Sequence, residues 1–322
     1  MFNNNIAILL STYNGEKYLA AQLESLLKQS YKNWVCFIRD DYSIDKTVDL
    51  IEKYTKKYPC RFQRVITSGE NLRPCKSFLE LLVQVDSSFD YIMFCDQDDV
   101  WDENKIDISL KVMKESENKI GIDTPILVHS DLEVVNENLE LVSKSMKLDQ
   151  KVNFKFNEIN YLVIQNIVTG CTMMINKELR NLVKNIPNNA VMHDWWLAIL
   201  ASCFGEIVFI DKPLIKYRQH NNNSIGAKKI NVINSIMKLK RNNLNKIYND
   251  YINMMEKSFK QAKEFFEIYK TELDQESLDV LDCFLSVKNK NRFKRTYHLR
   301  EFNIKGQNHL TNVFYKTIIT IM

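Results

Sequence analysis

The first 130 residues alternate short, mainly apolar runs with stretches whose apolar residues recur at helical spacing. The runs occupy residues 6–10, 34–38, 62–66, 91–95 and 126–129. Between the first two, Leu19, Leu23 and Leu26 form one helical stripe, and the segments 77–85 and 102–114 have the same periodicity. Strands that are buried on both faces and separated by helices predict an α/β protein with an open, mostly parallel sheet flanked by helices.

The run at residues 91–95 leads directly into three carboxylates, Asp96, Asp98 and Asp99. Like charges at the end of a strand repel one another unless a cation lies among them. Mg²⁺ and Mn²⁺ prefer a few carboxylates together with the oxygens of a phosphate. The cluster therefore predicts a metal that bridges the protein to a phosphorylated ligand. The alternative is an acidic turn that caps the next helix.

Polar clusters also follow the first two predicted strands. Ser11-Thr12-Tyr13 follows the first strand, and Asp40-Asp41 follows the second. In sheets of this kind, ligands bind beyond the carboxyl ends of the strands. The two clusters and the acidic one are therefore expected to meet in a single crevice.

The composition of the chain changes near residue 227. Residues 228–322 contain 18 Lys and Arg against 10 Asp and Glu, a net charge of +8 in a chain whose total is +4. Helical periodicity recurs in this part, for example at Phe265, Phe266 and Tyr269. We therefore predict two units, an α/β domain over residues 1–227 and a helical, basic C-terminal region over residues 228–322.

The cysteine pattern and the lengths of the apolar runs indicate the cellular compartment in which the protein is expected. Seven cysteines are scattered and form no Cys-x-x-Cys pair, which is typical of small core residues in a reducing compartment. Neither a secretion signal nor an apolar run near 18 residues is visible, so the sequence favours a cytoplasmic protein. No nucleic acid is expected as a partner.

The C-terminal region also carries a basic cluster followed by apolar residues. Such a pattern favours a peripheral position on an anionic membrane surface, at the inner face of the cell membrane. The alternative is a helix that packs in the core or in a homo-oligomer. The basic residues are Lys288, Lys290, Arg292, Lys294, Arg295 and Arg300, and the apolar residues are Val313, Phe314, Ile318, Ile319 and Ile321.

Five motifs occur in order along residues 5–226. They are Ser11-Thr12-Tyr13-Asn14-Gly15, Asp40-Asp41-Tyr42-Ser43, Asp96-Gln97-Asp98-Asp99-Val100-Trp101, His193-Asp194-Trp195-Trp196 and Tyr217-Arg218-Gln219-His220. In these motifs the chain resembles bacterial family 2 glycosyltransferases of the GT-A fold, and within them the rhamnosyltransferase-like branch of polysaccharide biosynthesis. The resemblance implies an inverting, metal-dependent hexosyltransferase that uses Mn²⁺ or Mg²⁺. Its implied reaction moves a sugar, such as L-rhamnose from dTDP-rhamnose, onto a growing, lipid-linked cell-surface glycan.

The resemblance also implies roles for single residues at the donor. Tyr13 would stack on the base of a dTDP- or UDP-linked sugar, Asp41 would accept a hydrogen bond from the base N3–H, and Asp96 would lie near the ribose or sugar. Asn71 begins an element that is often Asn-x-Gly in the family, but Arg73 replaces the glycine. The implied donor-binding residues are Ser11, Thr12, Tyr13, Asp41, Asn71, Asp96 and Gln97.

The remaining implied roles concern the reaction itself. Asp98 and His220 would hold the metal that neutralises the diphosphate leaving group. Asp194 would be the general base, and Trp195 and Trp196 would contact the acceptor, a glycan or lipid-linked saccharide. A carboxylate base and a cation are also what inversion at an anomeric carbon needs on chemical grounds alone.

Two other classes of function stay open at this point. A nucleotidyltransferase on a related α/β fold would also use acids and Mg²⁺, but it should have a Gly-rich, basic loop after the first strand, where this chain has only Gly15. A non-catalytic scaffold that binds sugars or nucleotides would have no need of Asp194. Release of the nucleotide from a sugar donor separates these alternatives from a transferase.

Overall fold

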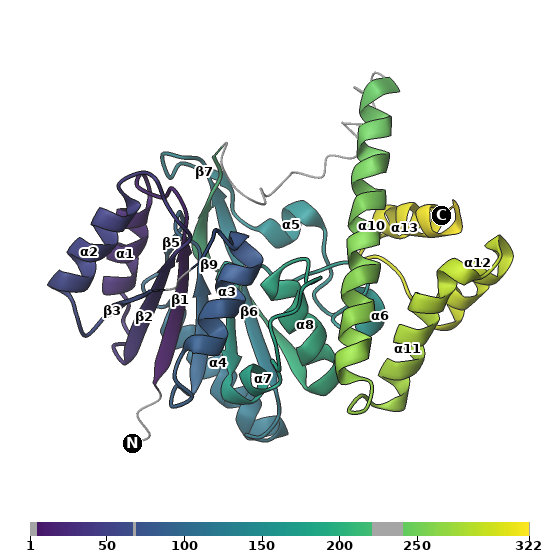
Figure 1. Ribbon diagram of the computed structural model, residues 1–322, viewed down its shortest axis with the longest axis horizontal. Helices are drawn as coiled ribbons and strands as arrows, with labels where there is room; N and C mark the ends of the chain where they lie inside the picture. Colours follow the sequence, from purple (N-terminus) through teal and green to yellow (C-terminus); the bar gives the residue numbers. More distant parts are fainter. Residues whose placement is uncertain (1–4, 67–68, 221–240, 322) are drawn as a thin grey trace.

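The computed structural model describes residues 5–66, 69–220 and 241–321 of the 322-residue chain. Over these residues it contains a nine-stranded sheet in the order β3-β2-β1-β4-β8-β6-β9-β5, with β7 paired to β6 (Figure 1). The strands are β1 (Ile6–Thr12), β2 (Trp34–Asp40), β3 (Phe62–Val65), β4 (Tyr91–Cys95), β5 (Val100–Trp101), β6 (Ile126–Val135), β7 (Leu141–Ser143), β8 (Met173–Asn176) and β9 (Glu206–Arg218).

Helices lie on both faces of the sheet and continue beyond it at the C-terminus (Figure 1). Those of the α/β part are α1 (Leu19–Leu27), α2 (Thr47–Lys57), α3 (Arg73–Gln84), α4 (Lys105–Ile120), α5 (Met146–Gln150), α6 (Ile159–Leu162), α7 (Lys177–Asn181) and α8 (His193–Phe204). The C-terminal helices are α10 (Arg241–Tyr269), α11 (Gln275–Ser286), α12 (Arg292–Glu301) and α13 (His309–Ile321).

The strand directions place the predicted polar clusters at one edge of the sheet. Strand β1 is parallel to β2 and β4, β2 is parallel to β3, and β6 runs in the same direction because antiparallel β8 lies between it and β4. Strand β9 is parallel to β6, while β5 and β7 run in the opposite direction. The predicted open, mostly parallel α/β sheet is therefore confirmed, and β8 makes it a mixed sheet.

Both faces of the central strands are buried, as the apolar runs predict. The side chains of Ile6, Ile8 and Leu10 join a core with α1, α2 and α4 on one face. Those of Ala7 and Leu9 join a second core with α3, α7 and α8 on the other face. This alternation follows from the two-residue period of a strand, and it explains why the runs contain few polar residues.

The C-terminal helices share the second core with the α/β part. Trp196 of α8 is fully buried, and its ring lies 5.4 Å from that of Phe265 and 6.3 Å from that of Tyr269, both on α10. Figure 1 shows α10 running between α8 on one side and α11 and α13 on the other. The predicted C-terminal helices are thus present, and they pack on the α/β part. The predicted boundary at residue 227 lies outside the described residues.

The C-terminal residues predicted to meet a membrane have mixed surroundings. Ile319 is buried in the second core, and the Arg295 guanidinium donates to its carbonyl oxygen at 3.0 Å, so neither residue is available to a lipid surface. Val313 is exposed, whereas the side chains of Phe314, Ile318 and Ile321 lie outside the described residues. No helix in the described part of the chain combines the length and the hydropathy needed to cross a bilayer.

Candidate active site

A cavity of about 1030 Å³ opens beyond the carboxyl ends of β1, β2 and β4 and reaches the first turn of α8. It brings together residues that are far apart in the sequence, as the convergence of strand ends predicts. Ten of the predicted site residues line it, namely Ser11, Thr12, Tyr13, Asp41, Asn71, Asp96, Gln97, Asp98, Asp194 and Trp195.

The loop after β1 presents an exposed aromatic ring to the cavity. The Tyr13 side chain is 49% exposed, while its backbone is fixed by Gln97 from the loop after β4. The Tyr13 N–H donates to Gln97 Oε1, and Gln97 Nε2 donates to the Tyr13 carbonyl, both at 2.9 Å. A Cβ on Gly15 would lie 2.2 Å from Gln97 Oε1, so the glycine makes room for this pair. The arrangement provides a rigid platform on which a flat base can stack.

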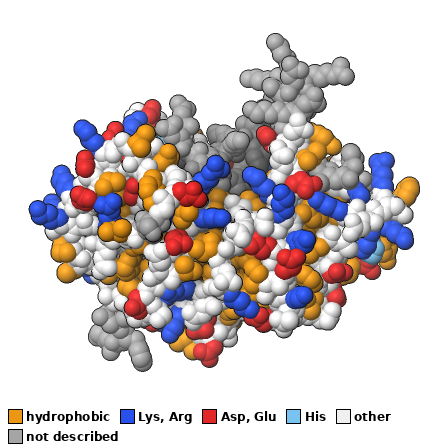
Figure 2. Space-filling model, in the orientation of Figure 1, with side chains coloured by type: hydrophobic (Ala, Val, Ile, Leu, Met, Phe, Trp, Pro, Cys, Tyr) orange, Lys and Arg blue, Asp and Glu red, His pale blue; other side chains and the backbone are white. Residues whose placement is uncertain are grey.

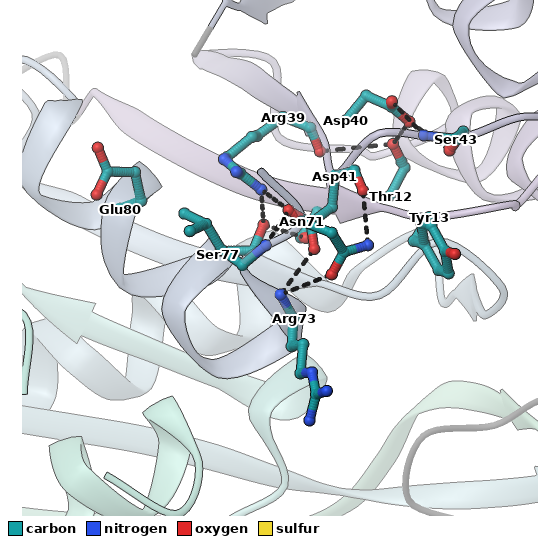
Figure 3. A network of polar contacts seen from close by, with 12 residues as sticks. Thr12, Tyr13, Arg39, Asp40, Asp41, Ser43, Asn71, Arg73, Ser77 and Glu80 are labelled. Atoms are coloured by element: carbon teal, nitrogen blue, oxygen red, sulfur yellow. Dashed lines mark hydrogen bonds and ion pairs between the residues drawn. The ribbon is translucent and has the colours of Figure 1, made fainter. Parts of the chain in front are cut away.

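The Asp41 carboxylate lies at the centre of a polar network at the end of β2 (Figure 3). It accepts hydrogen bonds from Arg39 Nη1 at 2.5 Å and from the backbone N–H groups of Leu72 and Arg73 at 2.8 Å. The Asn71 side-chain amide donates to the Asp41 carbonyl oxygen at 2.8 Å. Asp41 and Asn71 therefore fix the loop that precedes α3. A carboxylate has about four lone-pair sites, so Asp41 can accept a further bond from a ligand.

The hydroxyl groups of Ser11 and Thr12 make hydrogen bonds to neighbouring side chains at the same edge of the sheet. The Ser11 and Ser77 hydroxyl oxygens lie 2.6 Å apart, and Thr12 Oγ1 donates to Asp40 Oδ1 at 2.9 Å. The Thr12 side chain is buried. Both residues line the cavity, but these hydrogen bonds of their hydroxyl groups position the ends of β1 and β2.

The structure brings the two predicted metal ligands together. His220 Nε2 lies 2.8 Å from Asp98 Oδ2, although 122 positions separate the two residues. The Asp98 carbonyl accepts a bond from Arg218 Nε at 2.8 Å, which joins the end of β9 to the acidic loop. Burial and the carboxylates of Asp98 and Asp194 raise the pKa of Asp96 to about 7. A divalent cation beside Asp98 would relieve this repulsion, so the residues fit the predicted metal.

A second group of ligand-type atoms lies deeper, where Asp96, Asp99 and Cys171 have atoms within 4.8 Å of one another. Burial raises the pKa of both the Asp99 carboxyl and the Cys171 thiol well above their usual values, which favours the neutral form of each group. A protonated thiol is a poor ligand for the hard cations Mg²⁺ and Mn²⁺. Asp99 instead accepts a bond from the Arg218 N–H at 3.0 Å and anchors β9. The motif pattern did not reveal this structural role of Asp99.

Asp194 lies in the first turn of α8, with its carboxylate at the cavity. Its oxygens accept bonds from the N–H groups of Gly170 at 2.9 Å and of Trp195 at 2.6 Å. Burial raises the pKa of Asp194 to about 7, against the lowering effect of these bonds. A carboxylate with a pKa near the working pH is well suited to general base catalysis.

The two tryptophans after Asp194 have different surroundings. Trp195 lines the cavity and is held by a bond from its indole N–H to the Leu162 carbonyl at 2.6 Å. Trp196 is fully buried against Phe265 of α10. The prediction that Trp196 contacts an acceptor is therefore wrong, because adjacent residues of a helix point in different directions and only Trp195 faces the cavity.

The sequence of this chain matches a known family over most of the α/β part. The model of the family described as "Glycosyl transferase family 2" matches residues 7–180, more than half of the chain. The chain belongs to glycosyl transferase family 2. It is therefore an enzyme that transfers a sugar, as the motifs predict.

Individual relatives agree with the family and with the fold. The dTDP-rhamnosyl transferase RfbG of Shigella flexneri is 30% identical over 227 residues, which are 68% of this chain and 74% of the relative. The structure of S. aureus TarS 1–349 with UDP-GlcNAc is 16% identical, has a TM-score of 0.53 and covers 98% of this chain and 90% of that one. The mannosyltransferase PcManGT from Pyrobaculum calidifontis, with GDP-Man and Mn²⁺, is 10% identical, has a TM-score of 0.51 and covers 93% and 86%. The two structures confirm the predicted GT-A-type fold.

Several cavity residues of this family 2 glycosyltransferase had no role in the sequence prediction, and three of them bear on the proposals below. Arg73 lines the cavity from the start of α3, and Met254 of α10 and Tyr315 of α13 line it from the C-terminal region. The replacement of the family's glycine by Arg73 was visible in the sequence. Nothing in the local pattern around Met254 or Tyr315 could indicate a site, because only the packing of α10 and α13 on the α/β part brings them there.

Proposed function

We propose that this family 2 glycosyltransferase transfers a sugar, with inversion and with Mn²⁺ or Mg²⁺, from a dTDP- or UDP-linked donor to a growing cell-surface glycan. The observation that supports the proposal is a single cavity lined by Tyr13, Asp41, Asp98 and Asp194, with His220 behind its wall at 2.8 Å from Asp98. The donor we favour is dTDP-rhamnose, from which L-rhamnose would be transferred, because the relative at 30% identity is a dTDP-rhamnosyl transferase.

The proposed chemistry assigns a role to each part of the cavity. Tyr13 stacks on the base, and Asp41 accepts a hydrogen bond from its N3–H. Asp98 and His220 would hold a divalent cation, and such an ion would supply positive charge at the leaving diphosphate. Asp194 takes the proton of the acceptor hydroxyl as that oxygen attacks the anomeric carbon from the face opposite the leaving group.

We also assign the acceptor to the side of the cavity that the C-terminal region completes. Trp195, Met254 and Tyr315 line this side, and they combine large apolar surface with the aromatic rings that suit a sugar face. The acceptor we propose is a glycan that is lipid-linked. Residues 1–227 would then form the donor-binding and catalytic unit, and residues 228–322 would contribute to acceptor choice.

A donor screen tests the proposed function. The full chain is incubated with Mn²⁺ and with dTDP-rhamnose or UDP-linked sugars, and released dTDP or UDP is measured against an Asp194→Asn control. We expect nucleoside diphosphate release with one donor and little release by the control. Pyrophosphate release from a nucleoside triphosphate and a sugar phosphate would indicate a nucleotidyltransferase. Tight nucleotide binding with no turnover of any donor would indicate a non-catalytic scaffold.

Helix α12 carries the surface that we propose for peripheral contact with the inner face of the cell membrane. Phe293 and Tyr297, one turn apart, are 87% and 63% exposed, and Arg292, Lys294 and Arg300 are exposed beside them. Figure 2 shows Lys and Arg side chains gathered around this end of the molecule. Exposed aromatic rings next to basic side chains are typical of helices that lie in the interface of an anionic bilayer.

Vesicle co-sedimentation of the full chain tests this surface. We expect binding to vesicles that contain phosphatidylglycerol but not to pure phosphatidylcholine, and we expect salt to weaken it. The double variant Phe293→Ser/Tyr297→Ser should lose most of the binding. The matched control, Ile44→Ser/Ile66→Ser, changes two similarly exposed apolar residues elsewhere and should keep it. Equal binding by both variants would contradict the proposal, and a change in molecular mass without vesicle binding would make α12 a homo-oligomer contact.

A further inference from the structure

Arg73 adopts a backbone conformation that favours glycine. It is the first residue of α3, and its φ is 62°, in the left-handed region that a side chain with a Cβ disfavours. Glycine adopts such angles freely. A strained residue that persists where glycine would fit better indicates that its side chain is needed.

Hydrogen bonds to the backbone of Arg73 stabilise its unusual conformation and leave its side chain free of the network around Asp41. Its backbone N–H donates to Asp41 Oδ2 at 2.8 Å and to Asn71 Oδ1 at 3.0 Å. Figure 3 shows the side chain directed away from this network, and it lines the cavity. The guanidinium makes no hydrogen bond or ion pair with any residue that the structure describes. Its donors are therefore available to a ligand.

The charges of the cavity wall indicate what kind of ligand this would be. Five carboxylates line the cavity, those of Asp41, Asp96, Asp98, Asp131 and Asp194. Among the described lining residues, Arg73 is the one Lys or Arg. An anionic substrate that enters such a cavity is repelled by the carboxylates and needs fixed positive charge. The planar fork of an arginine binds two oxygens of a phosphate at once, which a lysine cannot do.

We propose that Arg73 binds the diphosphate of a substrate. The inference rests on the proposed function, in which two substrates carry such a group, the nucleotide-sugar donor and a lipid-linked acceptor. Arg73 lies on the loop that Asp41 fixes, beside the proposed nucleoside pocket. The donor carries its diphosphate on that nucleoside, so this position favours the donor over the acceptor as the source of the diphosphate.

The variant Arg73→Gly separates a binding role from a structural one, because the two roles predict opposite results. It removes the guanidinium and relieves the backbone strain, so the melting temperature should stay the same or rise. At the same time, the affinity for dTDP or UDP in the presence of Mn²⁺ should fall about 10- to 100-fold, as expected for a lost charge-assisted hydrogen bond. Arg73→Lys should keep part of the affinity. Lys76→Ala removes a nearby positive charge outside the cavity wall and should change neither quantity.

Binding of different probes shows which substrate, the donor or the acceptor, carries the diphosphate that Arg73 binds. Titrations of the full chain use dTDP, UDP, thymidine, uridine and geranyl diphosphate. If only the nucleoside diphosphates bind more weakly to Arg73→Gly, the donor is the source, and if only geranyl diphosphate does, the acceptor is. Unchanged affinity for all diphosphates, or an equal loss for the nucleosides, would overturn the inference. A wild-type protein that binds no nucleoside diphosphate would instead contradict the proposed function itself.

Discussion

Replacing Asp98 by asparagine is expected to lower sugar transfer by roughly 10²-fold or more while the fold stays intact. The change removes the negative charge that faces His220 at 2.8 Å, but it leaves the side-chain volume and creates no cavity in the core. The rate of nucleoside diphosphate release with Mn²⁺ measures the effect, and circular dichroism checks the fold. EDTA should inhibit the wild-type enzyme to a similar extent, and added Mn²⁺ or Mg²⁺ should restore it.

A matched control for this prediction lies a few residues away. Asp102 belongs to the same acidic stretch but does not line the cavity, so Asp102→Asn should transfer sugar at the wild-type rate. Full activity of the wild type in EDTA would remove the metal from the proposed mechanism. Loss of activity in Asp102→Asn would mean that the acidic loop is sensitive to any substitution.

The second large effect is expected for Asp194→Asn, which should lower transfer about 10²–10⁴-fold without weakening donor binding. The amide cannot accept the proton of the acceptor hydroxyl, whereas the nucleotide pocket around Tyr13 and Asp41 is untouched. Donor affinity from titration with dTDP or UDP should therefore match the wild type. A collapse of donor affinity in this variant would make Asp194 a binding residue and would contradict its role as the base.

The same residue predicts the pH dependence of the wild-type enzyme. Burial raises the pKa of Asp194 to about 7, and only the ionised carboxylate can accept a proton. The rate at saturating donor should therefore fall about tenfold for each pH unit below 7 and level off above it. A rate that stays constant down to pH 5 would show that Asp194 is ionised there and that its raised pKa does not control turnover.

The features that could be predicted from sequence are those set by local pattern. The buried strands 6–10 and 91–95 follow from apolar runs, and the meeting of Tyr13, Asp41 and Asp98 follows from the parallel strand ends. Because parallel strands present their carboxyl ends at one edge, the sequence alone is enough to place residues from distant motifs together.

The features that could not be predicted depend on tertiary packing. Strand β8 is limited to Met173–Asn176, and just before it Gly170 packs against His193 so closely that a Cβ would lie 2.7 Å from the His193 ring. This contact joins residues that lie far apart in sequence, so no local pattern indicates it. Strand β9 continues through Pro213 to Arg218, and its register with β6 shifts near this proline. The burial of Trp196 depends on α10, which no local pattern around residue 196 reveals.

The Gln97 amide connects the acidic loop after β4 with the loop that carries Tyr13. Its neighbours in sequence, Asp96 and Asp98, belong to the acidic strand end, whereas its hydrogen bonds hold the backbone of Tyr13. Any shift of the acidic loop therefore moves the aromatic platform as well. If a cation changes the position of this loop, it also changes the affinity of Tyr13 for a nucleoside, and by thermodynamic linkage the nucleoside changes the affinity for the cation by the same factor. Through Gln97, the two ends of a nucleotide would then be recognised together.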